Sequence, residues 1–210
     1  LVPSKMSKSP TTGVDFTDEP SAIADRKYTE YNPELAKKLW QEGLKETGQK
    51  QINLTLTADN TDTTKKMAEY LQSNMEKDLP GFHLNISSVP FKTRLQRQVS
   101  KNFDMVTSAW VADYPDPTNF LDLQTTGNSN NDGSWSNKEY DEAVKKAETT
   151  DANNPEARWN DMLKAQHIIT KEQGVITTYQ DNGAALTKPN SKGFNITPTG
   201  IYDMGAAYKK

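Results

Sequence analysis

Two hydrophobic periodicities alternate along the middle of the chain. Residues 51–58 and 82–89 alternate apolar and polar side chains with the two-residue period of a strand, and residues 103–111 form the most strand-like run of all. Helical spacing of apolar residues separates these runs, and crossovers of this length connect parallel strands. We therefore predict an α/β fold with a mixed, mainly parallel sheet and helices on both faces. The 51–58 strand should lie between the other two, with residues 175–180 antiparallel beyond.

Cap residues bound the predicted helices. Asn32-Pro33 opens a helix that stops at Gly48, and Asn154-Pro155 opens a long helix that ends at Gly174. Ser136 and Glu139 form a capping box that begins a helix running to about Glu148. Two further helices are marked by apolar residues at spacing three or four: Met67, Leu71 and Met75 in one, and Phe91, Leu95 and Val99 in the other.

Both ends of the chain lack these periods. Residues 1–31 are rich in Pro, Ser, Thr and Asp, which predicts an irregular lead-in on the surface. Residues 175–180 and 184–189 are predicted as short strands around the turn Asp181-Asn182-Gly183, a hairpin signal. The final twenty residues carry no assignable pattern.

Composition excludes several classes of function. The 210 residues carry a net charge of −3 with both signs interspersed, so nothing favours a polyanionic partner. The absence of cysteine removes thiol catalysis, thiolate metal sites and disulfides. No apolar run is long enough to cross a bilayer, and the first residue is Leu1, which suits a mature or truncated piece of a longer protein.

The segment "TSAWVADYPDPTNFLDL", residues 107–123, concentrates the candidate chemistry. Asp113 could act with Asp116 or Asp122 as the acid and base of a hydrolase, and this enzyme stays the alternative hypothesis. Asp116 lies between two prolines, however, where its carboxylate is expected to bond the local backbone, and Asp122 is expected on a helical turn. No Ser/His/Asp arrangement and no phosphate-binding glycine loop is present, so we expect no catalytic residue.

Two other patterns have simpler explanations. The loop before the 136–148 helix matches an EF-hand calcium pattern except at its first position, which is Asn128. The matching residues are Asn130, Asp132, Gly133 and Glu139. We expect no metal ion here, because the departure removes a carboxylate and Glu139 is assigned to the capping box. The basic residues Lys92, Arg94, Arg97 and Lys101 are expected to form a solvated helix face, not a nucleic-acid site.

Trp110 and Asp113 remain. Taken alone, they are explained by a core aromatic and a turn cap. Their position favours a different role, because ligands of parallel sheets bind outside the carboxyl ends of strands. A carboxylate there, beside a large aromatic ring, could hold the cationic group of a ligand.

At this motif the sequence resembles the extracellular solute-binding proteins of family 5, the oligopeptide-binding receptors of ABC importers, and most of all those of lactobacilli and related Gram-positive bacteria. The resemblance rests on "SVPFKTRL", "FDMVTSAW" and "WVADYPDPTNFLDL", between residues 88 and 123. It continues in order through "WSNKEYDEAVKKA", "EARWNDMLKAQHII" and "QGVITTYQDNGAAL", between residues 135 and 186. It implies a lobe of the periplasmic-binding-protein type II kind and a chain that is only the carboxyl-terminal portion of a receptor. Residues 1–31 would then be the lead-in of the second lobe, 32–192 the ligand-binding lobe, and 193–210 a tail returning to an absent first lobe.

The resemblance also implies a binding site. Asp113 matches the aspartate that pairs with a peptide's α-amino group, Trp110 matches a pocket aromatic, and Phe91 falls where relatives often place another. The backbone of Ala109, Val111 and Ala112 matches a segment that binds an extended peptide as an added strand, with Ser108 preceding it.

As partners, the resemblance implies an oligopeptide ligand and ABC permease subunits. It also implies a monomer at the extracellular face of the cell membrane, held there by a lipid anchor in the full-length protein. No cofactor is implied. Thr107 and Thr63 depart from residues that some relatives carry near the ligand, so the length and class of the substrate stay open.

Overall fold

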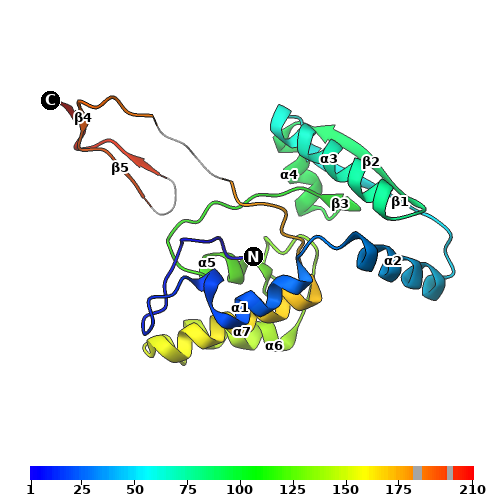
Figure 1. Cartoon of the computed structure of the whole chain (residues 1–210), viewed down its shortest axis with the longest axis horizontal. Coiled ribbons are helices and arrows are strands. Elements are labelled where there is room, and N and C mark those ends of the chain that lie inside the picture. Colours follow the sequence, from blue (N-terminus) through cyan, green and yellow to red (C-terminus); the bar gives the residue numbers. More distant parts are fainter. Residues whose placement is uncertain (182–185, 198–200) are drawn as a thin grey trace. The chain divides into compact units, whose positions relative to one another are not determined.

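The computed structural model describes residues 1–181, 186–197 and 201–210 (Figure 1). Contacts group the chain into two compact units. Unit 1 comprises Leu1–Thr29 and Trp110–Lys210, and unit 2 comprises Glu30–Ala109. The predicted lobe and tail boundaries, at residues 32 and 193, concern the parts of a longer receptor and stay a prediction.

Unit 2 contains a three-stranded sheet in the order β2-β1-β3. Strand β1 (Ile52–Asp59) pairs in parallel with β2 (Phe82–Val89) along its whole length and with β3 (Met105–Val106) at two positions. The parallel pairing and the central place of β1 confirm the predicted order. Residues 175–180 take no regular structure, so the predicted antiparallel strand there is wrong. The turn predicted beside it runs into residues outside the described ranges.

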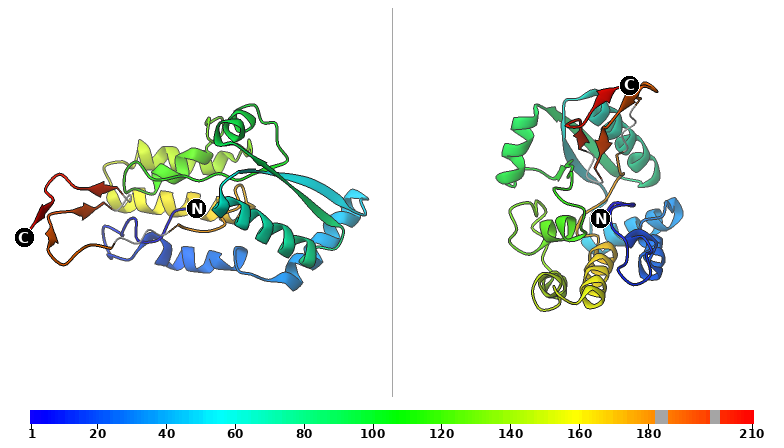
Figure 2. Two further views of the ribbon diagram at one scale, coloured as in Figure 1. Left: turned by 90° about the horizontal axis from the view of Figure 1, so that it is seen from above. Right: turned by 90° about the vertical axis from the view of Figure 1, so that its left-hand side faces the viewer.

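Helices cover both faces of this sheet, as predicted (Figure 2). Because successive strand residues point to opposite faces, the even-numbered apolar residues of β1 and β2 form one core with α3 (Asp62–Asp78). The fully buried members of this core are Leu56, Ala58, Ala68, Phe82 and Leu84. On the other face, Ser87 accepts a hydrogen bond from Arg97 of α4 (Phe91–Val99) at 2.9 Å. Helix α2 (Pro33–Thr47) precedes β1, with Asn32 as its N-cap and Gly48 (φ 67°) ending it as expected.

Helix α4 contradicts the predicted solvated basic face. Arg94 is only 5% exposed, and its Nε lies 2.8 Å from Oδ1 of Asp59 at the carboxyl end of β1. Phe91, by contrast, is 55% exposed, and Leu95 and Val99 are also exposed. The interpretation is therefore wrong for Arg94, because the sheet places a carboxylate against the helix face that the sequence pattern marks as polar.

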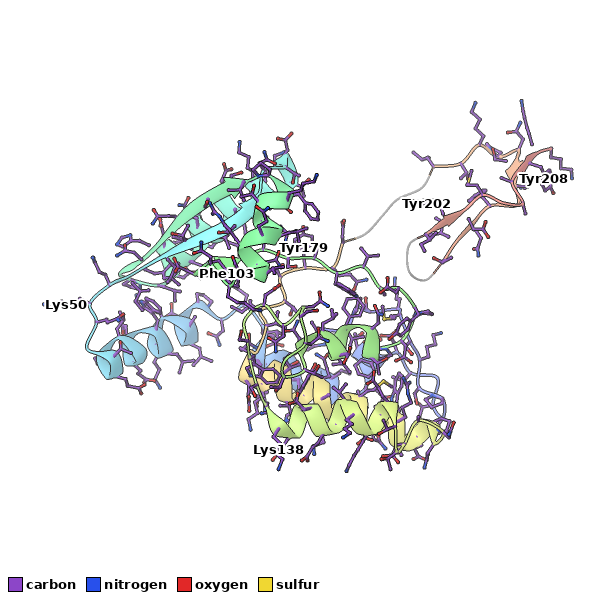
Figure 3. The ribbon with its side chains drawn as sticks, turned by 180° about the vertical axis from the view of Figure 1, so that it is seen from behind. Lys50, Phe103, Lys138, Tyr179, Tyr202 and Tyr208 are labelled. Atoms are coloured by element: carbon purple, nitrogen blue, oxygen red, sulfur yellow. The ribbon has the colours of Figure 1, made fainter. Side chains whose placement is uncertain are left out.

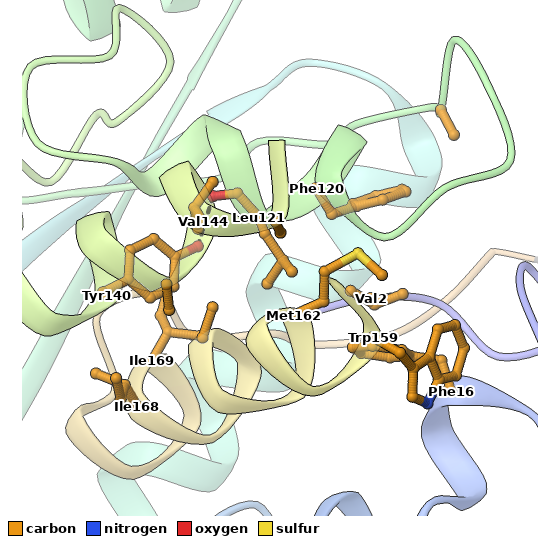
Figure 4. Packing of buried hydrophobic residues seen from close by; sticks show 14 residues of the cluster. Val2, Phe16, Phe120, Leu121, Tyr140, Val144, Trp159, Met162, Ile168 and Ile169 are labelled. Carbon is orange, nitrogen blue, oxygen red and sulfur yellow. Dashed lines mark hydrogen bonds between the residues drawn. The ribbon is translucent and has the colours of Figure 1, made fainter. Parts of the chain in front are cut away.

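Unit 1 is mainly helical, and its core lies between packed helices (Figure 4). Helices α6 (Lys138–Glu148) and α7 (Pro155–Glu172) pack along each other, and α1 (Pro20–Asp25) packs on α7. The short helices are η1 (Phe16–Asp18), η2 (Arg26–Tyr28), α5 (Thr118–Leu121) and η3 (Asp122–Gln124). The N-cap of α6 is Asn137, whose side chain accepts from the Tyr140 N–H, so the capping box predicted at Ser136 is wrong by one residue. Helix α7 has the predicted Asn154 cap and ends one residue before expected, at a left-handed Gln173.

The lead-in is not the irregular surface segment that we predicted. Besides α1, it supplies Val2 and Phe16 to the core of unit 1. Phe16 is 1% exposed and packs edge-on against Trp159, with ring centroids 5.1 Å apart. The indole N–H of Trp159 donates to Glu19 at 2.9 Å. The partners of this segment lie about 140 residues later, which is why no local period reveals them.

The tail forms two short antiparallel pairs: β4 (Ser191–Lys192) with β7 (Tyr208–Lys209), and β5 (Asn195–Ile196) with β6 (Tyr202–Asp203). Tyr202 and Tyr208 are exposed on these strands (Figure 3). No helix in the described part of the chain is both long and apolar enough to span a membrane.

Candidate functional site

The candidate site begins where β3 ends early. The predicted strand 103–111 pairs only at Met105–Val106, after which the Thr107 N–H donates to the Thr57 carbonyl at 3.0 Å. Within residues 1–181, 186–197 and 201–210, no backbone hydrogen bond involves Ala109, Val111 or Ala112. The predicted strand length is therefore wrong, and these three residues lack backbone partners in the sheet; Val111 is exposed, whereas Ala112 is buried in the core of unit 1.

The two prolines turn the chain into helix α5. Asp116 accepts hydrogen bonds at Oδ1 from the Thr118 N–H at 3.0 Å and from the Thr118 hydroxyl at 2.7 Å. Asp122 lies in the helical turn η3. These positions confirm the roles predicted for both carboxylates, with Asp116 in turn chemistry and Asp122 on a helical turn.

Arg158, which the sequence patterns did not single out, fixes this turn to α7. Its two terminal nitrogens donate to Oδ2 and Oδ1 of Asp116 at 2.8 and 2.9 Å, and its Nε donates to the Ala147 carbonyl at 3.1 Å. Burial by itself raises the pKa of Asp116, but the hydrogen bonds from Arg158 and Thr118 outweigh it and hold that pKa below its ordinary value. The same hydrogen bond to Asp116 raises the pKa of Arg158.

We expect acid to weaken this anchor. Because the pKa of Asp116 is lowered in the folded state, its contribution is complete above the ordinary aspartate pKa of about 3.9 and is lost as the pH falls through the lower folded value. Urea unfolding should show Asp116→Asn destabilising unit 1 clearly at pH 5 and much less at the lowest pH where the protein stays folded. Glu148 also faces Arg158, and burial raises its pKa, so Glu148→Gln is the control. An Asp116→Asn loss of equal size at both pH values would contradict the prediction.

Trp110 and Asp113 come just before the proline turn and are exposed to solvent. Trp110 is 40% exposed, and Asp113 is exposed as well. The Trp110 indole N–H and the Asp113 backbone N–H both donate to Oδ1 of Asn119, at 2.9 and 3.1 Å. In the described residues, the Asp113 carboxylate has neither an ion pair nor a hydrogen bond, so it is open to a ligand.

The predicted site residues are divided between the two units. Trp110, Val111, Ala112 and Asp113 are consecutive in unit 1. The other three, Phe91, Ser108 and Ala109, belong to unit 2. There the Ser108 hydroxyl accepts a hydrogen bond from Gln98 at 3.3 Å, and the Phe91 ring faces Arg94 at 5.0 Å. A ligand role for these seven residues stays a prediction.

The side chains of the loop with the EF-hand-like pattern form hydrogen bonds with nearby backbone. Oδ1 of Asn128 accepts from the Asn130 N–H at 2.9 Å, and Nδ2 of Asn128 donates to the Asp122 carbonyl at 3.0 Å. The side chain of Asn131 is buried and bonds the backbone of Trp135 in both directions. Over the described residues, no three His, Cys, Asp or Glu side chains are grouped so that they could hold a metal ion.

The parallel sheet covered on both faces, together with the solved structures that superpose on this chain, defines the class: a lobe of the periplasmic-binding-protein type II kind. The chain belongs to the bacterial extracellular solute-binding proteins, family 5, whose model for the middle region matches residues 5–132. This confirms the family that the sequence resembles.

Individual relatives agree with this assignment. The dipeptide-binding protein of Lactococcus lactis subsp. cremoris is 40% identical over 214 residues, covering 100% of this chain and 38% of its own. The structure of Listeria monocytogenes OppA bound to peptide superposes with a TM-score of 0.83 at 33% identity, covering 100% of this chain and 39% of that one. A peptide-binding protein of a peptide ABC transporter superposes with a TM-score of 0.77 at 39% identity, covering 84% of this chain and 75% of that one. The chain thus spans well under half the length of the Lactococcus relative.

Proposed function

We propose that the chain is the carboxyl-terminal portion of a receptor that captures extracellular peptides for an ABC importer. One observation carries the proposal: the exposed Asp113 carboxylate lies beside Trp110, immediately after a strand-like segment whose main chain is unpaired. A peptide's charged α-amino group suits the carboxylate, and its extended backbone suits the segment. The peptide relatives of the family support this ligand class.

Each proposed contact has a distinct role in peptide binding. The backbone of Ala109, Val111 and Ala112, with Ser108 before it, bonds the peptide main chain, which gives affinity without reading side chains. Trp110 and Phe91, both partly exposed aromatics, line pockets for peptide side chains. Such a site suits a receptor that accepts many peptide sequences.

The proposed receptor needs a first lobe, permease subunits and a membrane anchor in addition to this chain. Relatives at least twice as long support a first lobe, supplied by the same longer protein, to which residues 193–210 return. The receptor delivers its peptide to the permease subunits of the importer as a monomer. It works at the outer face of the cell membrane, where a lipid anchor in the full-length protein holds it.

The alternative is a hydrolase using Asp113 with Asp116 or Asp122, and the geometry disfavours the pairing with Asp116. The Asp116 carboxylate is held by Arg158 at both oxygens, and its pKa is lowered, so it is unsuited to donate a proton. Family members are named for solute binding. We therefore propose a receptor without catalytic activity.

Blocking the peptide amino group tests the proposal. Calorimetry on the complete gene product should show free peptides of two to six residues binding at least about 100-fold more tightly than their N-acetylated forms, because acetylation removes the charge that Asp113 pairs with. Peptides amidated at the carboxyl end serve as the control for a blocked terminus. Equal affinity for free and acetylated peptides, or hydrolysis of the bound peptide, would reject it.

A further inference from the structure

Asn119 is a buried amide that contacts two of the candidate ligand residues in unit 1, Trp110 and Asp113. Its side chain is 7% exposed and lies in the single turn of α5. Oδ1 accepts the Trp110 indole N–H at 2.9 Å and the Asp113 backbone N–H at 3.1 Å. One oxygen atom thus holds the Trp110 ring and the backbone that carries the Asp113 carboxylate relative to each other.

The position of this oxygen is itself fixed. The Asn119 N–H donates to the Asp116 carbonyl at 3.1 Å, and the Asp116 carboxylate is held at both oxygens by Arg158 of α7. A chain of hydrogen bonds therefore connects the packed core of unit 1 to the Trp110–Asp113 segment. Without it, residues 110–113 have no backbone bonds in the described structure that would orient them.

The residue type also suits this task. An amide oxygen accepts two N–H donors without carrying charge. A carboxylate at the same place would accept both bonds, but it would add a second negative charge near Asp113 and compete for the cation. An apolar side chain of the same size would leave two donors unsatisfied.

We infer that Asn119 is a positioning residue that sets Trp110 and Asp113 in the geometry required to select a charged amino group. The inference rests on the proposed function and deepens it, since it assigns amine selectivity to a residue that does not touch the ligand. Asn119 acts on amine selectivity through Asp113, so this part of its effect disappears when Asp113 no longer carries a charge.

The test replaces Asn119 by leucine, which is similar in size, in the complete gene product. The Trp110 indole N–H signal, assigned by its loss in Trp110→Phe, should shift and lose hydrogen-exchange protection. Affinity for a free tripeptide should fall about 10-fold or more, while affinity for its N-acetylated form changes little. In an Asp113→Asn background, the same replacement should change free-peptide affinity less than threefold.

Asn128→Leu is the matched control, because Asn128 also bonds local backbone in unit 1 and contacts neither Trp110 nor Asp113. It should leave the Trp110 signal and the preference for free peptides unchanged. If Asn119→Leu does not fold, Asn119→Asp retains the acceptor. That variant should keep the Trp110 signal protected and still lose part of the amine selectivity.

Three outcomes overturn the inference: an unprotected Trp110 indole in the unsubstituted protein, an unchanged signal in Asn119→Leu, or equal losses with and without the Asp113 charge. Failure of the proposed function looks different. If the proposed function fails, Asp113→Asn itself leaves the affinity for free peptides unchanged. If only the inference fails, Asp113→Asn still weakens free-peptide binding, but Asn119→Leu does not change amine selectivity.

Discussion

Asp113→Asn in the complete gene product is expected to weaken binding of free peptides by about 3 to 5 kcal/mol, a factor of roughly 100 to several thousand. Asparagine keeps the size of the side chain and removes only the charge. The exposed carboxylate costs little to maintain in the unliganded protein, because water solvates it. If a ligand and the proposed first lobe exclude that water, the variant would leave the peptide's ammonium group buried without its counter-ion.

Calorimetry with free and N-acetylated peptides measures this effect. Acetylated peptides should bind the variant and the unsubstituted protein nearly alike, since neither pair contains the charge interaction. Asp122→Asn is the matched control, because Asp122 lies nine residues further along in the helical turn η3 and is not a proposed ligand contact. Unchanged affinity of Asp113→Asn for free peptides, or an equal loss in Asp122→Asn, would refute the role assigned to Asp113.

Phe16→Ala is expected to destabilise unit 1 by about 3 to 5 kcal/mol. The phenylalanine lies in a segment that by sequence resembles a surface lead-in, yet it is 1% exposed and packs against Trp159 on α7. The substitution to alanine leaves a cavity between the lead-in and α7, inside the core of unit 1. Urea unfolding followed by tryptophan fluorescence should show a lower midpoint with little change in slope.

Phe91→Ala provides the matched control, because it removes the same ring from a site that is 55% exposed. Its cation–π contact with Arg94 is lost, and we expect a cost of about 1 kcal/mol or less. Equal losses in the two variants would show that the lead-in does not contribute to the core as described.

The sequence predicts best those elements whose signal is local. The strands Ile52–Asp59 and Phe82–Val89 follow from alternation, and the helices Pro33–Thr47 and Pro155–Glu172 follow from apolar spacing between recognisable caps. The parallel order of the sheet also follows, because helical crossovers leave few arrangements. The strands and helices themselves depend on residues within a few positions of each other.

The failures share a different cause. The run 103–111 is strand-like along its length, but pairing ends at Val106 although its partner β1 continues to Asp59, and a local pattern does not show where two strands separate. Helix α4 is amphipathic by pattern, yet Asp59 on the neighbouring strand draws Arg94 to the buried side. Phe16 appears alone in a polar segment because its partner is distant in the sequence.

The same distinction holds for the candidate site. The sequence by itself determined the family, the central parallel strands and the placing of Trp110 and Asp113 in one short segment, since these depend on local pattern and motif. Only the tertiary structure showed that Asn119 accepts hydrogen bonds from both residues and that Arg158 anchors the turn from 42 positions away. Hydrogen-bond partners and burial depend on which elements meet in space, and a one-dimensional pattern does not contain that information.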